Sequence, residues 1–256
     1  MPLTDSFTRL LLRGLLAGLI AGLLAGTVGF VIGEPKVDSA ISVEEADSAA
    51  ETDTGHSHAD AGAPADTASQ DDSDELVSRT GQKLGEFLAL GLGGLALGAI
   101  VASVAHVARR YTTLSGPALV GALGVAGWLA VTAVPFFKYP ANPPAVGEPD
   151  TINQRTLLWL AAVILGLVAV GAAVFVQRLL AAQPGTVRVI GAVAAFVIVT
   201  AIGYIALPGV NEVKPDFPAT LLWQFRVSSL AVSATLWAVL GSAFAILTEF
   251  VDRKRA

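Results

Sequence analysis

The chain has 256 residues, of which 54% are hydrophobic and only 14% are charged. Soluble domains contain about 25% charged residues, so this composition excludes an ordinary soluble domain and is typical of a membrane protein. The absence of cysteine excludes disulfides, thiolate metal sites and cysteine nucleophiles. The formal net charge of −5 hides an uneven distribution, because the acidic residues are concentrated in one stretch.

Six apolar runs are long enough to cross a bilayer, for which about 20 residues are needed. We expect transmembrane helices at Leu10–Ile32, Leu84–Val107, Pro117–Phe137, Leu157–Val176, Val187–Leu207 and Val227–Phe250. The expected fold class is therefore an all-α integral membrane protein, with a single membrane domain over residues 1–256. The first run could instead be a cleaved signal peptide. Against this, it is longer than a signal h-region of about 7–15 residues and lacks a clean cleavage site.

Basic residues near the span ends set the orientation, because flanking Lys and Arg stay in the cytoplasm. With six spans, the basic ends fall on one side, namely Arg9, Arg13, Arg109, Arg110, Arg178, Arg188, Arg253, Lys254 and Arg255. We expect a multi-pass protein of the cytoplasmic membrane with both termini cytoplasmic. Its surroundings are the lipid bilayer, and we expect no nucleic-acid partner. The spans would pair into three hairpins with long outer loops.

The first outer loop is strongly acidic. We expect residues 51–72 to be disordered, because they carry too little apolar bulk to offset the entropy of ordering. His56 and His58 lie in this stretch. Imidazole together with carboxylate oxygens suits divalent metals such as cobalt, nickel or zinc. The alternative is that both histidines belong to a solvated spacer.

The second outer loop, Pro135 to Thr156, contains five prolines. Each proline fixes its own φ and removes a backbone donor, so we expect a rigid, non-helical segment. In the third loop, Asn211, Glu212 and Asp216 mirror Asn142, Glu148 and Asp150 of the second. Because unpaired charge is costly at membrane depth, the arginines that close these loops are expected to meet carboxylates or carbonyls.

A threefold pattern relates the three predicted hairpins. The first helix of each pair exits into a proline and the second opens just after an arginine, at Pro35 and Arg79, Pro135–Pro140 and Arg155, and Pro208 and Arg226. An internal repeat would explain this pattern. So would the common use of arginine as an anchor at the headgroup level. Both interpretations stay open.

Glycines recur every fourth residue in the first span, at Gly14, Gly18, Gly22 and Gly26, and Gly94 and Gly98 share a face of the second. In lipid, small residues at this spacing allow helix backbones to approach closely. We therefore expect tight helix packing, with a glycine-lined conduit as the alternative.

The spans themselves are almost free of ionisable groups. The exceptions lie near span ends, at Arg13, Glu86, His106 and Glu249. The sequence has no Walker loop, no Gly-x-Ser-x-Gly elbow and no convincing catalytic triad. We therefore expect no enzymatic activity. We also expect the functional polar side chains to lie in the outer loops.

The loop sequences resemble the CbtA family of predicted cobalt transporter subunits. The resemblance covers nearly the whole chain and rests on Gly33-Glu34-Pro35 with Asp38 to Ile41, the run Lys138 to Gly147, Thr151, Arg155-Thr156, Leu207-Pro208, Asn211-Glu212-Val213, Phe217-Pro218-Ala219, Leu222-Trp223 and Phe225-Arg226. It implies a cobalt-uptake membrane protein, with Co²⁺ as the transported ion and no permanently bound cofactor. It also implies a small single-span partner similar to the CbtB subunit, which has a histidine-rich end.

Two functions are weighed. In the first, an acidic outer vestibule collects the cation. Its candidate metal ligands are Glu34, Asp38, Glu44, Glu45, His56, His58, Glu148 and Glu212, and its candidate structural residues are Lys138, Tyr139, Asn142, Arg155, Asn211, Trp223 and Arg226. In the second, the chain is a non-transporting structural or assembly protein whose outer loops dock a partner. A homo-oligomer is a further possibility.

Overall fold

The computed structural model describes residues 6–54, 79–147 and 149–253, and every regular element in these ranges is helical. The α-helices are α1 (Phe7–Val28), α2 (Glu34–Thr54), α3 (Arg79–Ala108), α4 (Gly116–Gly127), α5 (Val134–Lys138), α6 (Ile152–Leu179), α7 (Gly185–Ala206) and α8 (Ala219–Arg253). Two π-helices, η1 (Gly29–Gly33) and η2 (Trp128–Ala133), and one 3₁₀ turn, η3 (Pro149–Thr151), complete the order. Within these ranges, six helices are long and apolar enough to cross a membrane, which confirms the predicted all-α membrane fold.

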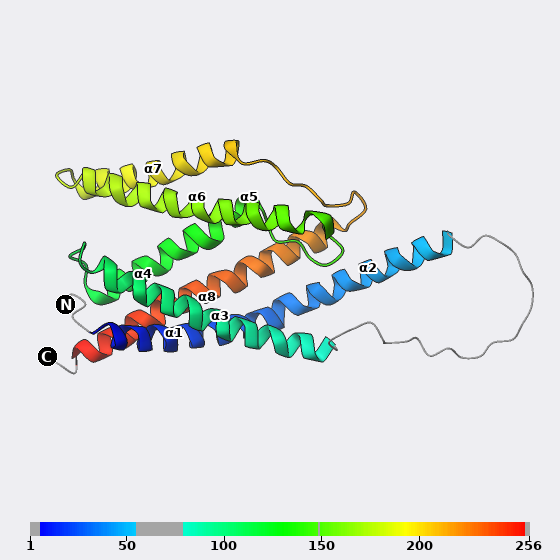
Figure 1. Ribbon diagram of the computed structural model, residues 1–256, viewed down its shortest axis with the longest axis horizontal. Helices are drawn as coiled ribbons and strands as arrows, with labels where there is room; N and C mark the ends of the chain where they lie inside the picture. The colour runs from blue at the N-terminus through cyan, green and yellow to red at the C-terminus, as the bar shows by residue number, and fades with distance from the viewer. Residues whose placement is uncertain (1–5, 55–78, 148, 254–256) are drawn as a thin grey trace, which may run out of the picture.

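The first span continues as one helix well past its predicted end. The elements α1, η1 and α2 follow one another without a break from Phe7 to Thr54, and α2 projects beyond the other helices (Figure 1). At about 1.5 Å per residue, this helix is much longer than the roughly 30 Å hydrocarbon core of a bilayer. The stretch predicted to be disordered, residues 51–72, begins inside α2, and its residues 55–72 lie outside the described residues.

Pro35 and Pro135 lie in helix interiors. The first helix was expected to end at Pro35, and Pro135 was expected to begin the non-helical loop, although the predicted third span ran to Phe137. In both cases a π-helix ends two residues before the proline. Proline has no N–H to donate, and its ring clashes with the carbonyl four residues earlier. The wider π turn bonds each N–H to the carbonyl five residues back, as Glu34 N–H does to Gly29, and so leaves room for the ring. The predicted loop also ends early, because α6 begins at Ile152.

Helices α1 and α3 pack most extensively, through their glycines. A Cβ added at Gly14, Gly18 or Gly22 would collide with the backbone of α3, and one added at Gly94 or Gly98 would collide with the backbone of α1. The backbones therefore touch directly, and the glycines serve close packing, as their spacing predicts. At Gly93, by contrast, an added Cβ would meet nothing within 4 Å.

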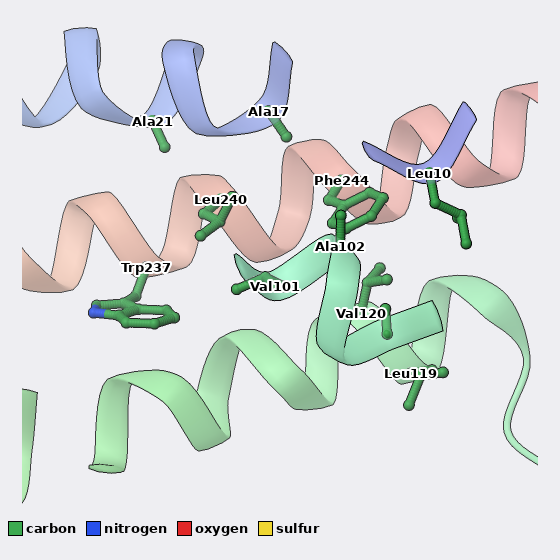
Figure 2. Close-up of a cluster of buried hydrophobic side chains, with 11 residues drawn as sticks. Leu10, Ala17, Ala21, Val101, Ala102, Leu119, Val120, Trp237, Leu240 and Phe244 are labelled. Atoms are coloured by element: carbon green, nitrogen blue, oxygen red, sulfur yellow. The ribbon is translucent and has the colours of Figure 1, made fainter. Parts of the chain in front are cut away.

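The main core joins α1, α3, α4 and α8. Ala17 and Ala21 point from α1 toward α8, and Leu240, Phe244 and Trp237 of α8 fill the space between α1, α3 and α4 (Figure 2). Small residues on α1 let α8 come close, and the bulky residues on α8 occupy the resulting space. This cluster fixes α8 against the glycine-packed pair.

The third predicted hairpin does not pack side by side. The first and second spans pack together, as do the third and fourth, but α7 packs mainly against α6, while α8 packs along α1 and α4. No residue of α7 is buried. Side-chain packing thus makes α8 part of the main bundle and leaves α7 at its edge (Figure 1). The hairpin prediction was based on chain order, which does not specify these contacts.

The connections are sorted between the two ends of the bundle. Helix α1 begins, and α8 ends, at the same end as the short α3–α4 and α6–α7 turns (Figure 1). The connections α5–α6 and α7–α8 lie at the opposite end, where α2 projects and α3 begins. We call this second end the polar end, because it holds the polar contacts described next.

Candidate functional site

Segments from three separate parts of the chain meet at the polar end. Ala40 of α2, Val146 of the α5–α6 loop and Phe217 of the α7–α8 loop are buried together in a small hydrophobic cluster. Their burial removes apolar surface from water and so holds the two loops against α2. In addition, the hydroxyl of Ser228 on α8 donates to the Ile32 carbonyl of η1 at 3.1 Å. The loops are therefore built into the bundle.

Arg79 joins α3 to α2 through two carboxylates. Its Nη2 lies 2.6 Å from Oε2 of Glu34 and 2.7 Å from Oδ1 of Asp38. Lys83, one helical turn later, reaches Oδ2 of Asp38 at 3.1 Å and Oε2 of Glu34 at 3.5 Å. Only 10% of the Glu34 side chain is exposed, against 47% for Asp38. Both carboxylates, which were predicted as metal ligands, are therefore neutralised by cations of this chain.

Removing Arg79 should destabilise the bundle more than removing Asp38. In Arg79→Met the Glu34 carboxylate stays buried with Lys83 as its remaining, more distant partner. We expect the free energy of unfolding to fall by about 2 kcal/mol, which is less than for a fully buried pair because Arg79 is partly exposed. In Asp38→Asn only an exposed charge is lost, and we expect less than about 1 kcal/mol. Thermal unfolding of both variants in detergent measures the difference. Equal losses would show that burial of Glu34 does not matter.

Glu212 holds the α7–α8 loop against the start of α6. Its Oε2 lies 3.2 Å from Nη1 of Arg155, and its Oε1 accepts a hydrogen bond of 2.5 Å from Oγ1 of Thr151. The Glu212 side chain is 9% exposed. Gly147 lies beside this pair with φ +123°, a conformation that favours glycine, and a Cβ there would collide with Nη1 of Arg155. The loop thus needs glycine at 147 to reach the ion pair.

Arg226 on α8 holds the α5–α6 loop from the other side. Its Nη2 donates to Oδ1 of Asn142 at 3.0 Å, and its Nε donates to the carbonyl of Ala141 at 3.3 Å. These contacts agree with the expectation that the arginines closing the outer loops meet carboxylates or carbonyls. Arg226 differs from Arg155 in one respect: within the described residues, neutral oxygens accept all of its hydrogen bonds.

Lys138 and Tyr139 join the end of α5 to the end of α7. Nζ of Lys138 donates to the carbonyl of Tyr204 at 2.9 Å, and the hydroxyl of Tyr139 donates to the carbonyl of Pro208 at 2.8 Å. In return, the hydroxyl of Tyr204 donates to the carbonyl of Val134 at 2.6 Å. Pro208 has no N–H to donate to the Tyr204 carbonyl four residues earlier, and Lys138 supplies that hydrogen bond instead.

Removing the Tyr139 hydroxyl should have a modest and pH-dependent effect. Burial raises the pKa of this phenol, so the folded chain holds its proton more tightly than the unfolded chain. That stabilisation is present below the unfolded pKa of about 10 and is lost as the pH rises through the higher folded value. We expect Tyr139→Phe to cost about 1 kcal/mol at neutral pH and to reduce the loss of stability in strong alkali. Melting temperatures of both proteins from neutral pH to strong alkali test this, and unchanged stability at neutral pH would contradict it.

A pocket of about 380 Å³ opens between the two loops, within the size range of small-ligand sites. Its polar wall is formed by Asn142, Arg155, Asn211, Glu212 and Arg226. The apolar wall includes Ile152 and Trp159 from the first turns of α6. Hydrogen-bond donors and acceptors, two guanidinium groups and one carboxylate therefore face one small volume at the polar end.

The structure brings some of the predicted site residues together and separates others. Asn142, Arg155, Asn211, Glu212 and Arg226 share the pocket, together with Tyr139. Glu34 and Asp38 lie in the separate Arg79 cluster, Glu44 and Glu45 are exposed on α2, and Trp223 is 68% exposed on a shallow groove beside Ile32. His56, His58 and Glu148 lie outside the described residues. Within the described ranges, no three His, Cys, Asp or Glu side chains gather as a metal site would require.

Four contributing residues were not identified from the sequence as members of the site. Lys83 reaches the Arg79 cluster, Thr151 binds Glu212, Tyr204 binds the end of the third span, and Gly147 gives the loop its shape. Gly147 follows the proline pair of the second loop, a usual position for a turn glycine. Thr151 is among the residues that carry the family resemblance, but its contact with Glu212 was not predicted. Lys83 and Tyr204 gave no signal, because their partners lie far away in the sequence.

Comparison with known families decides the identity. The family model described as "Probable cobalt transporter subunit (CbtA)" matches residues 7–249. The chain belongs to the CbtA family. No curated protein and no solved structure matches it. As a member of this family it is a multi-pass membrane protein connected with cobalt uptake, and the word subunit implies partners in a complex. The loop residues that carry the resemblance include most of those that line the pocket.

Proposed function

We propose that this CbtA chain is the membrane subunit through which a transporter takes up cobalt, and that the cation is collected at the pocket between the α5–α6 and α7–α8 loops. The observation that carries the proposal is the position of the pocket. It is lined by the family-like loop residues Asn142, Asn211 and Glu212, and it opens at one end of a six-span bundle. Carboxylate and amide oxygens are suitable ligands for a hydrated divalent cation.

The charge of the two ends supports an outward-facing pocket. Arg9, Arg13, Arg109, Arg110, Arg178 and Arg188 lie toward the end at which α1 begins and α8 ends. Basic residues near span ends favour the cytoplasm. The chain would therefore lie in the cytoplasmic membrane with both termini inside, and the polar end would face outward.

Metal selectivity would come from a second chain. Oxygen ligands alone do not favour cobalt, which binds imidazole well. The described histidine, His106, lies near the inner end of α3, far along the chain from the pocket residues. The partner would be a small single-span chain, similar to CbtB, that brings histidines to the pocket, and His56 and His58 of this chain lie outside the described residues.

Two observations favour the second function, a docking protein that does not transport. The described carboxylates Glu34, Asp38 and Glu212 are already paired with cations of this chain, and the C-terminal part of α2 projects beyond the other helices (Figure 1). A loop end built from internal ion pairs could present a surface to another membrane protein. The uptake experiment distinguishes this function from transport.

The test is uptake of radioactive Co²⁺ by cobalt-starved cells that express the chain alone or with its candidate single-span partner. Excess Ni²⁺ and Zn²⁺ are added in parallel to measure selectivity. We expect saturable uptake that requires this chain and rises when the partner is present. Background uptake in both cases, with both proteins inserted in the membrane, would favour the docking function.

A further inference from the structure

The pocket carries more positive charge than the binding of a bare cation would require. Arg155 and Arg226 both line it, whereas Glu212 is the one acidic side chain among its described lining residues. Glu212 is 3.2 Å from Arg155, so these two charges balance each other. Arg226 therefore supplies a positive charge that no carboxylate of the described chain offsets. A free Co²⁺ ion entering the pocket would be repelled by it.

The geometry of Arg226 suits an anion. Its Nε and Nη2 are held by Ala141 and Asn142, which fixes the guanidinium plane. Its remaining nitrogen, Nη1, has no hydrogen-bond partner within the described residues. A fixed guanidinium is a preferred ligand for carboxylate and phosphate oxygens. The amides of Asn142 and Asn211 can add further hydrogen bonds to the same ligand.

We propose that the pocket receives the metal as a complex with a small polycarboxylate, whose free carboxylate binds Arg226. Such a complex carries net negative charge, so the cationic wall attracts it, while the metal remains available to histidines of a partner. This inference rests on the proposed cobalt uptake and specifies the form of the substrate. The volume of about 380 Å³ has room for a chelate larger than a hydrated ion.

Direct binding tests the proposal. The purified chain in nanodiscs of zwitterionic lipid is titrated by calorimetry with citrate, with CoCl₂, and with cobalt citrate. We expect saturable binding of citrate and of cobalt citrate, in competition with each other, and at least tenfold weaker binding of CoCl₂. No binding of either citrate form to the wild-type chain would overturn the proposal without the use of any variant.

A matched pair of variants locates the site. Arg226→Gln removes the charge but keeps a side chain that can donate to Asn142, whereas Lys214→Gln removes an exposed charge from the α7–α8 loop outside the pocket. We expect Arg226→Gln to weaken citrate binding at least tenfold and Lys214→Gln to leave it unchanged. Equal effects would contradict a site at Arg226. Size-exclusion profiles check that both variants are folded.

Two further arms separate the alternatives. If glycerol phosphate or anionic nanodisc lipid competes for the pocket with a much higher affinity than citrate has, the pocket is a lipid-headgroup site and the proposal fails. Cellular cobalt uptake is measured with and without citrate in the medium. If the rate of cobalt uptake changes neither with citrate in the medium nor with Arg226→Gln, the chelate is rejected and cobalt transport still stands. No uptake at all would reject the proposed function itself.

Discussion

Replacing Gly94 by leucine is expected to disrupt the bundle, with a loss of stability of about 3 kcal/mol or more. An added Cβ at this position would collide with the Gly18 carbonyl and would lie 2.9 Å from the Cα of Gly22. These contacts are backbone atoms, which cannot move aside as a flexible side chain can. The helices α1 and α3 would have to separate, and α8 would lose its packing surface on α1.

The neighbouring glycine provides the control. Gly93 lies on the same helix but is exposed, and an added Cβ there has open space. Gly93→Leu therefore tests the loss of glycine without the collision, and we expect stability within about 0.5 kcal/mol of wild type, as for other exposed sites. Melting temperature and monodispersity in mild detergent are the measurements. Similar melting temperatures for the two variants would show that the α1–α3 contact does not stabilise the fold.

Replacing Glu212 by alanine is expected to lower cobalt uptake at least tenfold at equal membrane abundance. The change removes the ion pair with Arg155 and the hydrogen bond from Thr151. Without these two contacts the α7–α8 loop is no longer held against the start of α6, and the wall of the pocket that it forms loses its position. The mechanism predicts a change in transport rate, with a smaller change in folding, because the main core lies elsewhere.

Asp216 supplies the matched control for this variant. It lies on the same loop, is exposed, and does not line the pocket. Asp216→Ala should leave uptake at the wild-type rate when surface abundance is normalised by immunoblot. If Glu212→Ala and Asp216→Ala transport cobalt equally well, Glu212 has no place in the transport site.

The sequence was sufficient to predict the spans, because uninterrupted apolar runs of this length need a bilayer to be stable. Glycines at every fourth position likewise predicted tight helix packing, since close backbone approach leaves no room for a Cβ, and the structure has this packing between α1 and α3. The helical course through Pro35 was not predicted, and at Pro135 the predicted span to Phe137 overlapped a loop that was predicted to be non-helical. Proline normally ends a helix, and the π turns that accommodate these two prolines have no periodic signal in the sequence. The place of α8 in the main bundle depends on side-chain fit with α1 and α4, which hydropathy does not record.

Part of the candidate site was also predictable from the sequence. Asn142, Arg155, Asn211 and Arg226 were identified together because their two loops have similar polar residues, and the structure places them around one pocket. Glu34 and Asp38 were assigned to metal from their acidity alone. Their neutralisation by Arg79 and Lys83 joins positions more than 40 residues apart, as the separation of 41 between Asp38 and Arg79 shows. Spacing in the sequence does not reveal such pairs.

The most direct test of an outward-facing cobalt entrance uses the absence of cysteine from the chain. Asn211→Cys places a single thiol at the pocket, and Asp216→Cys places one on the same loop away from it. Intact cells are treated with a membrane-impermeant maleimide, and cobalt uptake is measured before and after. We expect both thiols to react from outside, but only modification of Asn211→Cys to block uptake. Labelling of Asn211→Cys that requires permeabilised cells, or complete labelling that leaves uptake unchanged, would contradict the proposed entrance.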